Sequence, residues 1–450
     1  MKRKRQRSLW AVLLALTLGA WLFPRSSQAA DAKGVFIQDY LPKELQKNLK
    51  VSLEMRYRLE GRDNFDFNES AHDTDTFDLL RTRLMLDANI SDSIRTFVQL
   101  QDSQIWDTTP NNRWSTTFRD EFDVRQAYID YKVKEISDAL TLRVGRQELS
   151  YGDQRLVGAF DWSNVAQSFD AAKLIYATKE YSVDAFLSEK VIIDRGNPNH
   201  WYDDNEGFHG IYAAYKGIEK HILDLYYFYR NSSEPVSFGS SGLGKLNEST
   251  IGFRFKGDKV NNFDYTLESA YQFGRFSSQD INAYCFITAA GYTLSGIPWT
   301  PHIGVGWDFA TGDKDATDSQ RNTFDNLWPT NHLYYGYIDL VSLQNINDYH
   351  FTVDFKPTKK LYLEGDYHLF YLNHTADAAY NAARATLRAA NQRVGSSYLG
   401  QEIDFLLKYA LNKNINLLGG YSHFFTGTFL ARTGANDDAN FFYLQSLLKF

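Results

Sequence analysis

The feature that most constrains this chain is an alternation of apolar and polar residues, which recurs in about eighteen short segments. Between positions 51 and 60 the sequence VSLEMRYRLE places an apolar side chain at every second residue. The same pattern recurs at 81–88, 140–144, 250–256, 361–369 and 402–409. Successive side chains of a strand point to opposite faces, so this period predicts strands with one apolar and one polar face.

The composition indicates where the apolar faces lie. Aromatic residues make up 16% of the chain, yet no segment after the N-terminal leader is an unbroken apolar run. A transmembrane barrel has this composition, because its lipid-facing and lumen-facing residues alternate. We therefore predict an all-β fold: a single-chain, transmembrane, antiparallel barrel of about 18 strands.

The connections between these segments alternate in length, which supports the barrel. Long connections are expected at 61–77, 105–120, 148–167 and 191–205, and short ones at 91–93, 134–139 and 178–180. Such barrels have short periplasmic turns and long extracellular loops. One exception is 275–279, which is short where a long loop is due. The Ala- and Arg-rich stretch 376–393 predicts a short helix in an outer loop.

The two ends of the chain carry export signals. Five cations precede an apolar run from Leu9 to Phe23, and small residues follow, which predicts a signal peptide over 1–29 and a barrel over 30–450. Six of the 48 cations lie in the leader, so 42 cations face 55 anions after cleavage, a net charge of −13. That acidity argues against nucleic acid as a partner. The last strand is amphipathic and ends in the aromatic residue Phe450, which resembles the C-terminal recognition signal of outer-membrane barrels. We predict a Gram-negative outer-membrane protein.

Several motifs resemble the alginate export family of outer-membrane barrels. They are GRQELSYGDQRLVGAFDWSN at 145–164, NTFDNLWPTNHLYYGYIDL at 322–340, RYRLE at 56–60 and RTRL at 81–84. The resemblance covers nearly the whole mature chain. It implies a barrel with a cation-lined lumen, which in alginate-secreting members conducts an anionic polysaccharide outward. The periplasmic turns are short, as at 411–413, so none supplies a gate, and the direction of transport stays open.

The candidate solute-binding residues are charged side chains on the inward faces. The cationic set is Arg56, Arg58, Arg81, Arg83, Arg143 and Arg254, with Lys256 beside it. Guanidinium groups pair with carboxylates, and rings of cations favour anion passage. The alternative is that these arginines pair with Glu54, Glu60 or Asp87 on neighbouring strands. We expect the first two strands to be neighbours and the open pore to prefer anions.

Two further groups complete the predicted site. The acidic group comprises Glu364, Asp366, Glu402 and Asp404 on two adjacent strands, and it either sets a field across the pore or pairs with nearby cations such as Lys408. The second group, from the 145–170 signature, comprises Arg146, Asp153, Arg155, Asp161, Trp162 and Asp170. If this loop folds inward its residues form a constriction, and otherwise they form a salt-bridge network that pins the loop.

The histidines show no close metal-ligand spacing, so we predict no metal and no cofactor. We expect outer-membrane lipids, the barrel assembly machinery and an anionic polysaccharide or small anionic solute as partners, and a monomer. Export of a polymer such as alginate and uptake of small organic anions remain open alternatives. An enzyme is not expected, since no GxSxG motif or local Ser/His pairing stands out. An adhesin or scaffold without transport is a further alternative.

Overall fold

The computed structural model describes residues 34–71, 73–109, 115–199, 206–237 and 242–450. The predicted signal peptide, 1–29, lies outside the described residues. None of the helices in these ranges has the length and hydrophobicity that a membrane-crossing helix needs.

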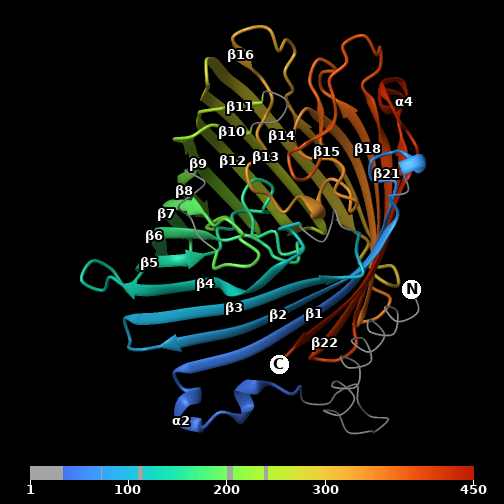
Figure 1. Cartoon of the computed structure of the whole chain (residues 1–450). Coiled ribbons are helices and arrows are strands. Elements are labelled where there is room, and N and C mark those ends of the chain that lie inside the picture. Colours follow the sequence, from blue (N-terminus) through green and yellow to red (C-terminus); the bar gives the residue numbers. More distant parts are fainter. Residues whose placement is uncertain (1–33, 72, 110–114, 200–205, 238–241) are drawn as a thin grey trace.

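The fold is a closed antiparallel β-barrel (Figure 1). Its main sheet holds 19 strands, of which 18 form the barrel; the two-residue β16 (Gln320–Arg321) only pairs in parallel with the first residues of β14. These are β1 (Leu49–Asp63), β2 (Asp75–Asn89), β3 (Ile94–Trp106), β4 (Asp120–Lys132), β5 (Leu140–Gln147), β6 (Phe169–Ala177), β7 (Tyr181–Lys190), β8 (Glu206–Tyr215), β9 (His221–Ser232), β12 (Leu246–Val260), β13 (Phe263–Phe276), β14 (Gln279–Thr293), β15 (His302–Ala310), β17 (Ile346–Phe355), β18 (Leu361–Leu372), β21 (Tyr398–Ala410), β22 (Ile415–Thr426) and β23 (Ala439–Lys449).

Each barrel strand pairs with the next one along the chain, and β1 closes the ring by pairing with both β2 and β23. Closure leaves no free sheet edge, so the backbone N–H and C=O groups of the strands are paired within the lipid. Two small hairpins belong to outer loops and are not part of the barrel wall: β10 (Val236–Ser237) with β11 (Leu243–Gly244), and β19 (Ala379–Tyr380) with β20 (Thr386–Arg388).

The helical pieces are short and lie between strands or before the first one. They are η2 (Ile37–Tyr40), α2 (Lys43–Gln46), η3 (Glu69–Ala71), η5 (Asn331–Leu333) and α4 (Thr428–Thr433). The segment before β1 is tied to the turn between β21 and β22, where the Val35 N–H donates to Oδ1 of Asn414 at 2.9 Å. Figure 1 shows this segment at the end of the barrel opposite the long loops.

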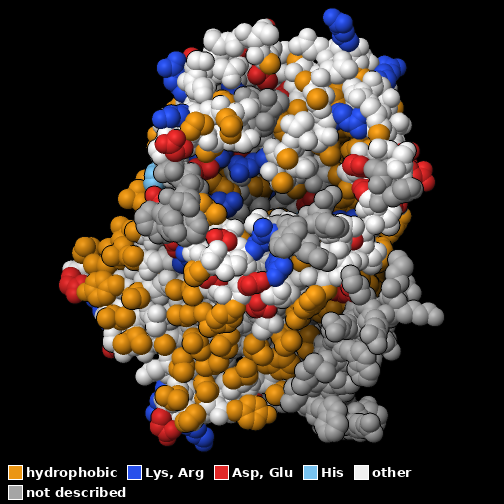
Figure 2. Space-filling view, viewed as in Figure 1, with side chains coloured by type: hydrophobic (Ala, Val, Ile, Leu, Met, Phe, Trp, Pro, Cys, Tyr) orange, Lys and Arg blue, Asp and Glu red, His pale blue; other side chains and the backbone are white. Residues whose placement is uncertain are grey.

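The period of two sorts side chains between lipid and lumen as expected. Apolar residues from six strands are more than half exposed on the outer surface: Leu187, Ile211, Leu225, Ile251, Phe405 and Leu444. Figure 2 shows the resulting apolar band around the lower wall. Charged residues on the opposite, inward faces of the strands are buried, as Arg58 of β1 and Arg81 of β2 at 1% exposure illustrate.

The connections follow the predicted alternation, including the exception. The outer turn between β13 and β14 contains only residues 277 and 278. The predicted helix over 376–393 is wrong, because this stretch forms the β19–β20 hairpin. Ala379 and Tyr380 are 0% and 2% exposed there, so packing against other outer loops overrides the helix propensity of alanine.

Candidate functional site

Two long outer loops, 148–168 and 311–345, fold into the barrel and pack against each other (Figure 1). The Trp328 N–H donates to the Leu156 carbonyl and the Gly158 N–H donates to the Trp328 carbonyl, both at 2.9 Å. Val157 and Trp328, which form an isolated parallel bridge, are 1% and 3% exposed. The lumen is therefore narrowed by a packed assembly of the two loops.

Loop 148–168 is held by a group of five inward arginines from β1, β2 and β4, which we name the arginine wall: Arg56, Arg58, Arg81, Arg83 and Arg125. Arg56 and Arg81 are direct register partners. Their guanidinium groups donate to the Asp161 carbonyl oxygen at 2.6 and 3.0 Å. They also donate to the Ser163 carbonyl at 2.9 and 3.3 Å, and Arg58 donates to the Trp162 carbonyl at 2.8 Å. The wall thus binds backbone oxygens of a loop that has no strand partner of its own there.

Carboxylates neutralise this wall only in part. Arg58 pairs with Glu60 at 2.7 Å, Arg81 with Glu54 at 3.0 Å, Arg83 with Asp161 at 2.6 Å, and Arg125 with Glu148. Five guanidinium groups therefore share four carboxylates, and Arg62 adds a further cation on Glu60 at 2.8 Å. Of the three pairing partners that the sequence analysis offered as an alternative, Glu54 is reached from the neighbouring strand, Glu60 is reached from the same strand, and Asp87 pairs with Arg95 instead. The group keeps a positive surplus.

Asp161 is the loop residue that contributes a carboxylate to this wall. Burial works against its ionisation, but attraction to Arg81, Arg83 and Arg56 is stronger and holds the pKa of this carboxyl well below its usual range. Its side chain is still 57% exposed, so the carboxylate borders the water-filled part of the lumen.

Loop 311–345 is held by three members of the predicted acidic group on β18 and β21. We name the whole group the carboxylate wall: Glu364, Asp366, Glu402 and Asp404. The Ile338 N–H donates to Oε1 of Glu402 at 2.9 Å and the Tyr337 N–H donates to Oδ1 of Asp404 at 3.4 Å. The Tyr337 hydroxyl donates to Oε1 of Glu364 at 2.6 Å. β18 and β21 are neighbours as predicted, and β22 and β23 separate them from β1.

The two loops also join the two walls. The Trp162 ring stacks on the His332 ring with centroids 3.7 Å apart, and the Arg58 guanidinium lies 3.8 Å from the centre of the Trp162 ring. Arg155 of loop 148–168 forms a buried ion pair with Asp308 of β15. The signature loop folds inward and is pinned by ion pairs, two features that the sequence analysis treated as alternatives.

The remaining predicted arginines are held in pairs with neighbouring carboxylates. Arg143 pairs with Asp130 at 2.6 Å, and Arg146 pairs with Asp170 at 2.9 Å. Arg254 lies 2.5 Å from Asp224 and 3.0 Å from Asp153 of loop 148–168. The structure places these three arginines outside the arginine wall.

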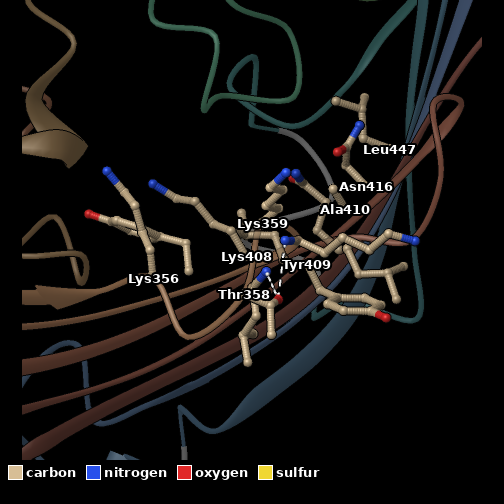
Figure 3. Close-up of a pocket in the computed structure, with 14 residues that line it drawn as sticks. Lys356, Thr358, Lys359, Lys408, Tyr409, Ala410, Asn416 and Leu447 are labelled. Carbon is tan, nitrogen blue, oxygen red and sulfur yellow. Dashed lines mark hydrogen bonds between the residues drawn. The ribbon is translucent and has the colours of Figure 1, made fainter. Parts of the chain in front are cut away.

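Sequence reasoning missed a lysine-rich pocket at the periplasmic mouth. A cavity of about 560 Å³ is lined by Lys356, Lys359, Lys360 and Lys408 among other residues (Figure 3). The ammonium groups of Lys356 and Lys408 lie 5.8 and 4.8 Å from the centre of the Tyr362 ring. Among the described residues neither has an ion-pair partner. The Lys-Pro-Thr-Lys-Lys run at 356–360 was the available signal.

Sequence reasoning also missed a cluster of two histidines and an aspartate. His350 and His368 are far apart in sequence but are register partners on β17 and β18. Together with Asp348 they bring three potential ligand atoms within 4.8 Å of one another. The register of the barrel, which linear spacing does not reveal, makes this cluster.

The fold resembles that of solved outer-membrane porins. OccAB2 of Acinetobacter baumannii aligns with a TM-score of 0.61 at 12% identity, over 93% of this chain and 99% of its own. A BenF-like porin from Pseudomonas fluorescens aligns with a TM-score of 0.60 at 11% identity, over 89% and 99%. OpdK of Pseudomonas aeruginosa, solved with vanillate, aligns with a TM-score of 0.58 at 12% identity, over 90% and 99%. At these identities the likeness concerns the fold.

No curated protein matches the chain in sequence. A family model described as alginate export matches residues 47–443, which is nearly the whole barrel. With the closed 18-strand barrel and its porin neighbours, this match identifies a channel of the porin kind in the outer membrane of a Gram-negative bacterium. The chain belongs to the alginate export family of outer-membrane β-barrel proteins.

Proposed function

We propose that this channel passes small organic anions. The observation that carries the proposal is the arginine wall, in which five guanidinium groups share four carboxylates beside the narrowed lumen. A solute in a narrow pore stays within the Debye length of about 8 Å at physiological salt, so this surplus acts on it with little screening. The local surplus then outweighs the net charge of the whole chain.

The periplasmic mouth supports the same polarity. Lys356 and Lys408 point into the pocket of Figure 3 without an ion-pair partner among the described residues. This second group of cations keeps the electrostatic potential positive at the end of the path, so an anion that leaves the arginine wall is still attracted. Rings of Lys or Arg are the usual device for anion pores.

The packing of the two loops favours small solutes over a polymer. Loop 148–168 is attached to the arginine wall, loop 311–345 is attached to the carboxylate wall, and the two loops contact each other. Passage of a polysaccharide would therefore require the loops to be displaced. One neighbour in fold, OpdK, was solved with vanillate, a small aromatic carboxylate. Solutes of that chemistry would suit a surplus of guanidinium groups.

Export of an anionic polysaccharide such as alginate is the second candidate, and membership of the alginate export family favours it. A uronate chain carries a carboxylate on every sugar and would bind the same arginines. The two candidates differ in the size of solute that the pore admits with both loops in place.

The test is the reversal potential of single channels in a salt gradient. Wild type should prefer anions, and the variant with Arg56, Arg58, Arg81 and Arg83 changed to Gln should lose most of that preference. The matched control changes Arg95 and Arg143 to Gln, because these lumen arginines pair with Asp87 and Asp130 outside the wall. Cation preference in wild type, or an equal shift in both variants, would refute the proposal.

Block of the current by added solutes separates the two candidates. Small carboxylates such as vanillate or benzoate should interrupt the wild-type current at lower concentration than oligouronates do. Prolonged block by oligouronates, combined with no effect of small carboxylates, would favour polysaccharide export.

A further inference from the structure

We propose that Asp348, His350 and His368 form a binding site for a divalent transition-metal ion such as Zn²⁺ on the lumen wall. The site follows from strand register. His350 of β17 is paired with His368 of β18, and Asp348 lies two residues before His350 on the same inward face. The proposal does not depend on which solute the channel passes.

The spacing of the donor atoms fits a metal ion. Nδ1 of His368 lies 3.0 and 3.1 Å from the two carboxylate oxygens of Asp348, and Nδ1 of His350 lies 3.5 Å from Oδ2. Ligands at about 2.0 Å from a tetrahedral zinc ion are about 3.3 Å apart. The nitrogen–oxygen distances lie on either side of that value, and all three donor atoms lie within 4.8 Å of one another, so they can converge on one ion.

The donors lack other partners. Asp348 is 0% exposed, and its carboxylate has no hydrogen-bond or ion-pair partner among the described residues other than these two histidines. Nδ1 of His350 is buried and makes no hydrogen bond within the described chain. A buried, unsatisfied ring nitrogen costs free energy, and binding a metal ion would remove that cost.

The neighbouring charges leave the site free for a cation. Asp308, the β15 register partner of Asp348, is engaged by Arg155. Asp366 and Asp404 lie beside His368 on β18 and β21, and they add negative potential without approaching Asp348 as hydrogen-bond partners. Two imidazoles with one carboxylate favour Zn²⁺, Cu²⁺ or Ni²⁺ over Ca²⁺ and Mg²⁺, which prefer oxygen ligands alone.

The test is calorimetric titration of the full barrel, purified in detergent without a histidine tag, with Zn²⁺. Wild type should bind one ion, and His350→Ala and His368→Ala should each weaken binding at least tenfold. His302→Ala is the matched control, since His302 is also a lumen histidine but its two ring nitrogens contact different carboxylates, Asp264 and Asp354. The control should bind as wild type does.

A spectroscopic readout distinguishes coordination from a structural role of the histidines. Electron paramagnetic resonance of bound Cu²⁺ should show two equivalent imidazole nitrogens in wild type and one in His350→Ala, a variant whose partly exposed side chain is the safer one to remove. No stoichiometric binding of Zn²⁺ or Cu²⁺, or an unchanged signal in that variant, would leave only a histidine–aspartate ion pair and overturn the proposal.

Discussion

The arginine wall and the carboxylate wall hold their loops by opposite halves of the peptide group. The arginines donate to carbonyl oxygens of loop 148–168, whereas Glu402 and Asp404 accept from N–H groups of loop 311–345. A loop inside a barrel has no strand to pair with, so its buried backbone groups need side-chain partners. The comparison teaches that much of the charge in this lumen serves to position irregular backbone.

The two walls differ in whether the loop that covers them leaves a charged group exposed to the lumen. Glu402 and Asp404 are 0% and 1% exposed because loop 311–345 covers them. The carboxylate of Asp161, by contrast, is 57% exposed beside an arginine group with a positive surplus. The five arginines are themselves only 1–6% exposed, so their positive surplus acts on a solute through the thin layer of loop 148–168 that ends in the exposed Asp161.

The largest effect should come from breaking the carboxylate wall. Changing Glu402 and Asp404 together to Ala removes the acceptors of two backbone N–H groups, and each donor left unsatisfied costs about 1–3 kcal/mol. We expect loop 311–345 to detach, with larger and noisier single-channel conductance. Glu402→Gln, which keeps an acceptor oxygen, is the control. Unchanged conductance in the double variant would show that the loop is held elsewhere.

A smaller effect should come from uncoupling the walls at Trp162. This ring contacts both His332 of the opposite loop and the Arg58 guanidinium, and the two contacts together are worth about 2 kcal/mol. Trp162→Ala should shorten the dwell time of the main conductance state. Trp162→Phe, which keeps an aromatic ring, should retain part of it. Equal behaviour of the Ala and Phe variants would argue against stacking as the link.

Asp161→Asn should increase the positive charge of the arginine wall without detaching the loop, because the backbone carbonyl of residue 161 still accepts from Arg56 and Arg81. The change removes one negative charge, and about 1 kcal/mol of added attraction would raise anion preference about fivefold at low salt. Reversal potentials measure the change. Asp315→Asn, on an exposed part of loop 311–345, should have no such effect. A fall in anion preference would contradict this assignment.

Much of the barrel was predictable from sequence, because each strand carries its own evidence. The alternation around Arg83 and Leu84 or around Leu363 and Glu364 determines which side chain faces lipid. The connection lengths determine which end of the barrel faces the cell exterior. The helix expected at 376–393 failed because burial of Tyr380 among outer loops cannot be read from local composition.

The site was predictable only as a set of inward charges. Nothing local to Arg81 indicates that its partners are backbone oxygens of Asp161 and Ser163, which lie 80 and 82 residues away. The pairing of His350 with His368 likewise depends on register between two strands. Long-range contacts of this kind arise when the loops fold inward, which the alternation does not encode.

The smallest effect concerns pH at the arginine wall. A carboxyl whose pKa is lowered by folding contributes stability above its unfolded pKa, and it loses that contribution only as pH falls through the folded pKa. The pKa of Asp161 is held well below its usual range, although burial opposes this, because Arg81, Arg83 and Arg56 surround it. An unperturbed aspartate is about half protonated near pH 4, whereas Asp161 should still be ionised there. The difference in reversal potential between wild type and Asp161→Asn should therefore be the same at pH 7 and pH 4. Taking the difference cancels the contribution of other lumen groups that both proteins share. If the difference falls by half at pH 4, Asp161 titrates as an ordinary carboxyl, and the arginines are too well screened by water to act on a passing anion.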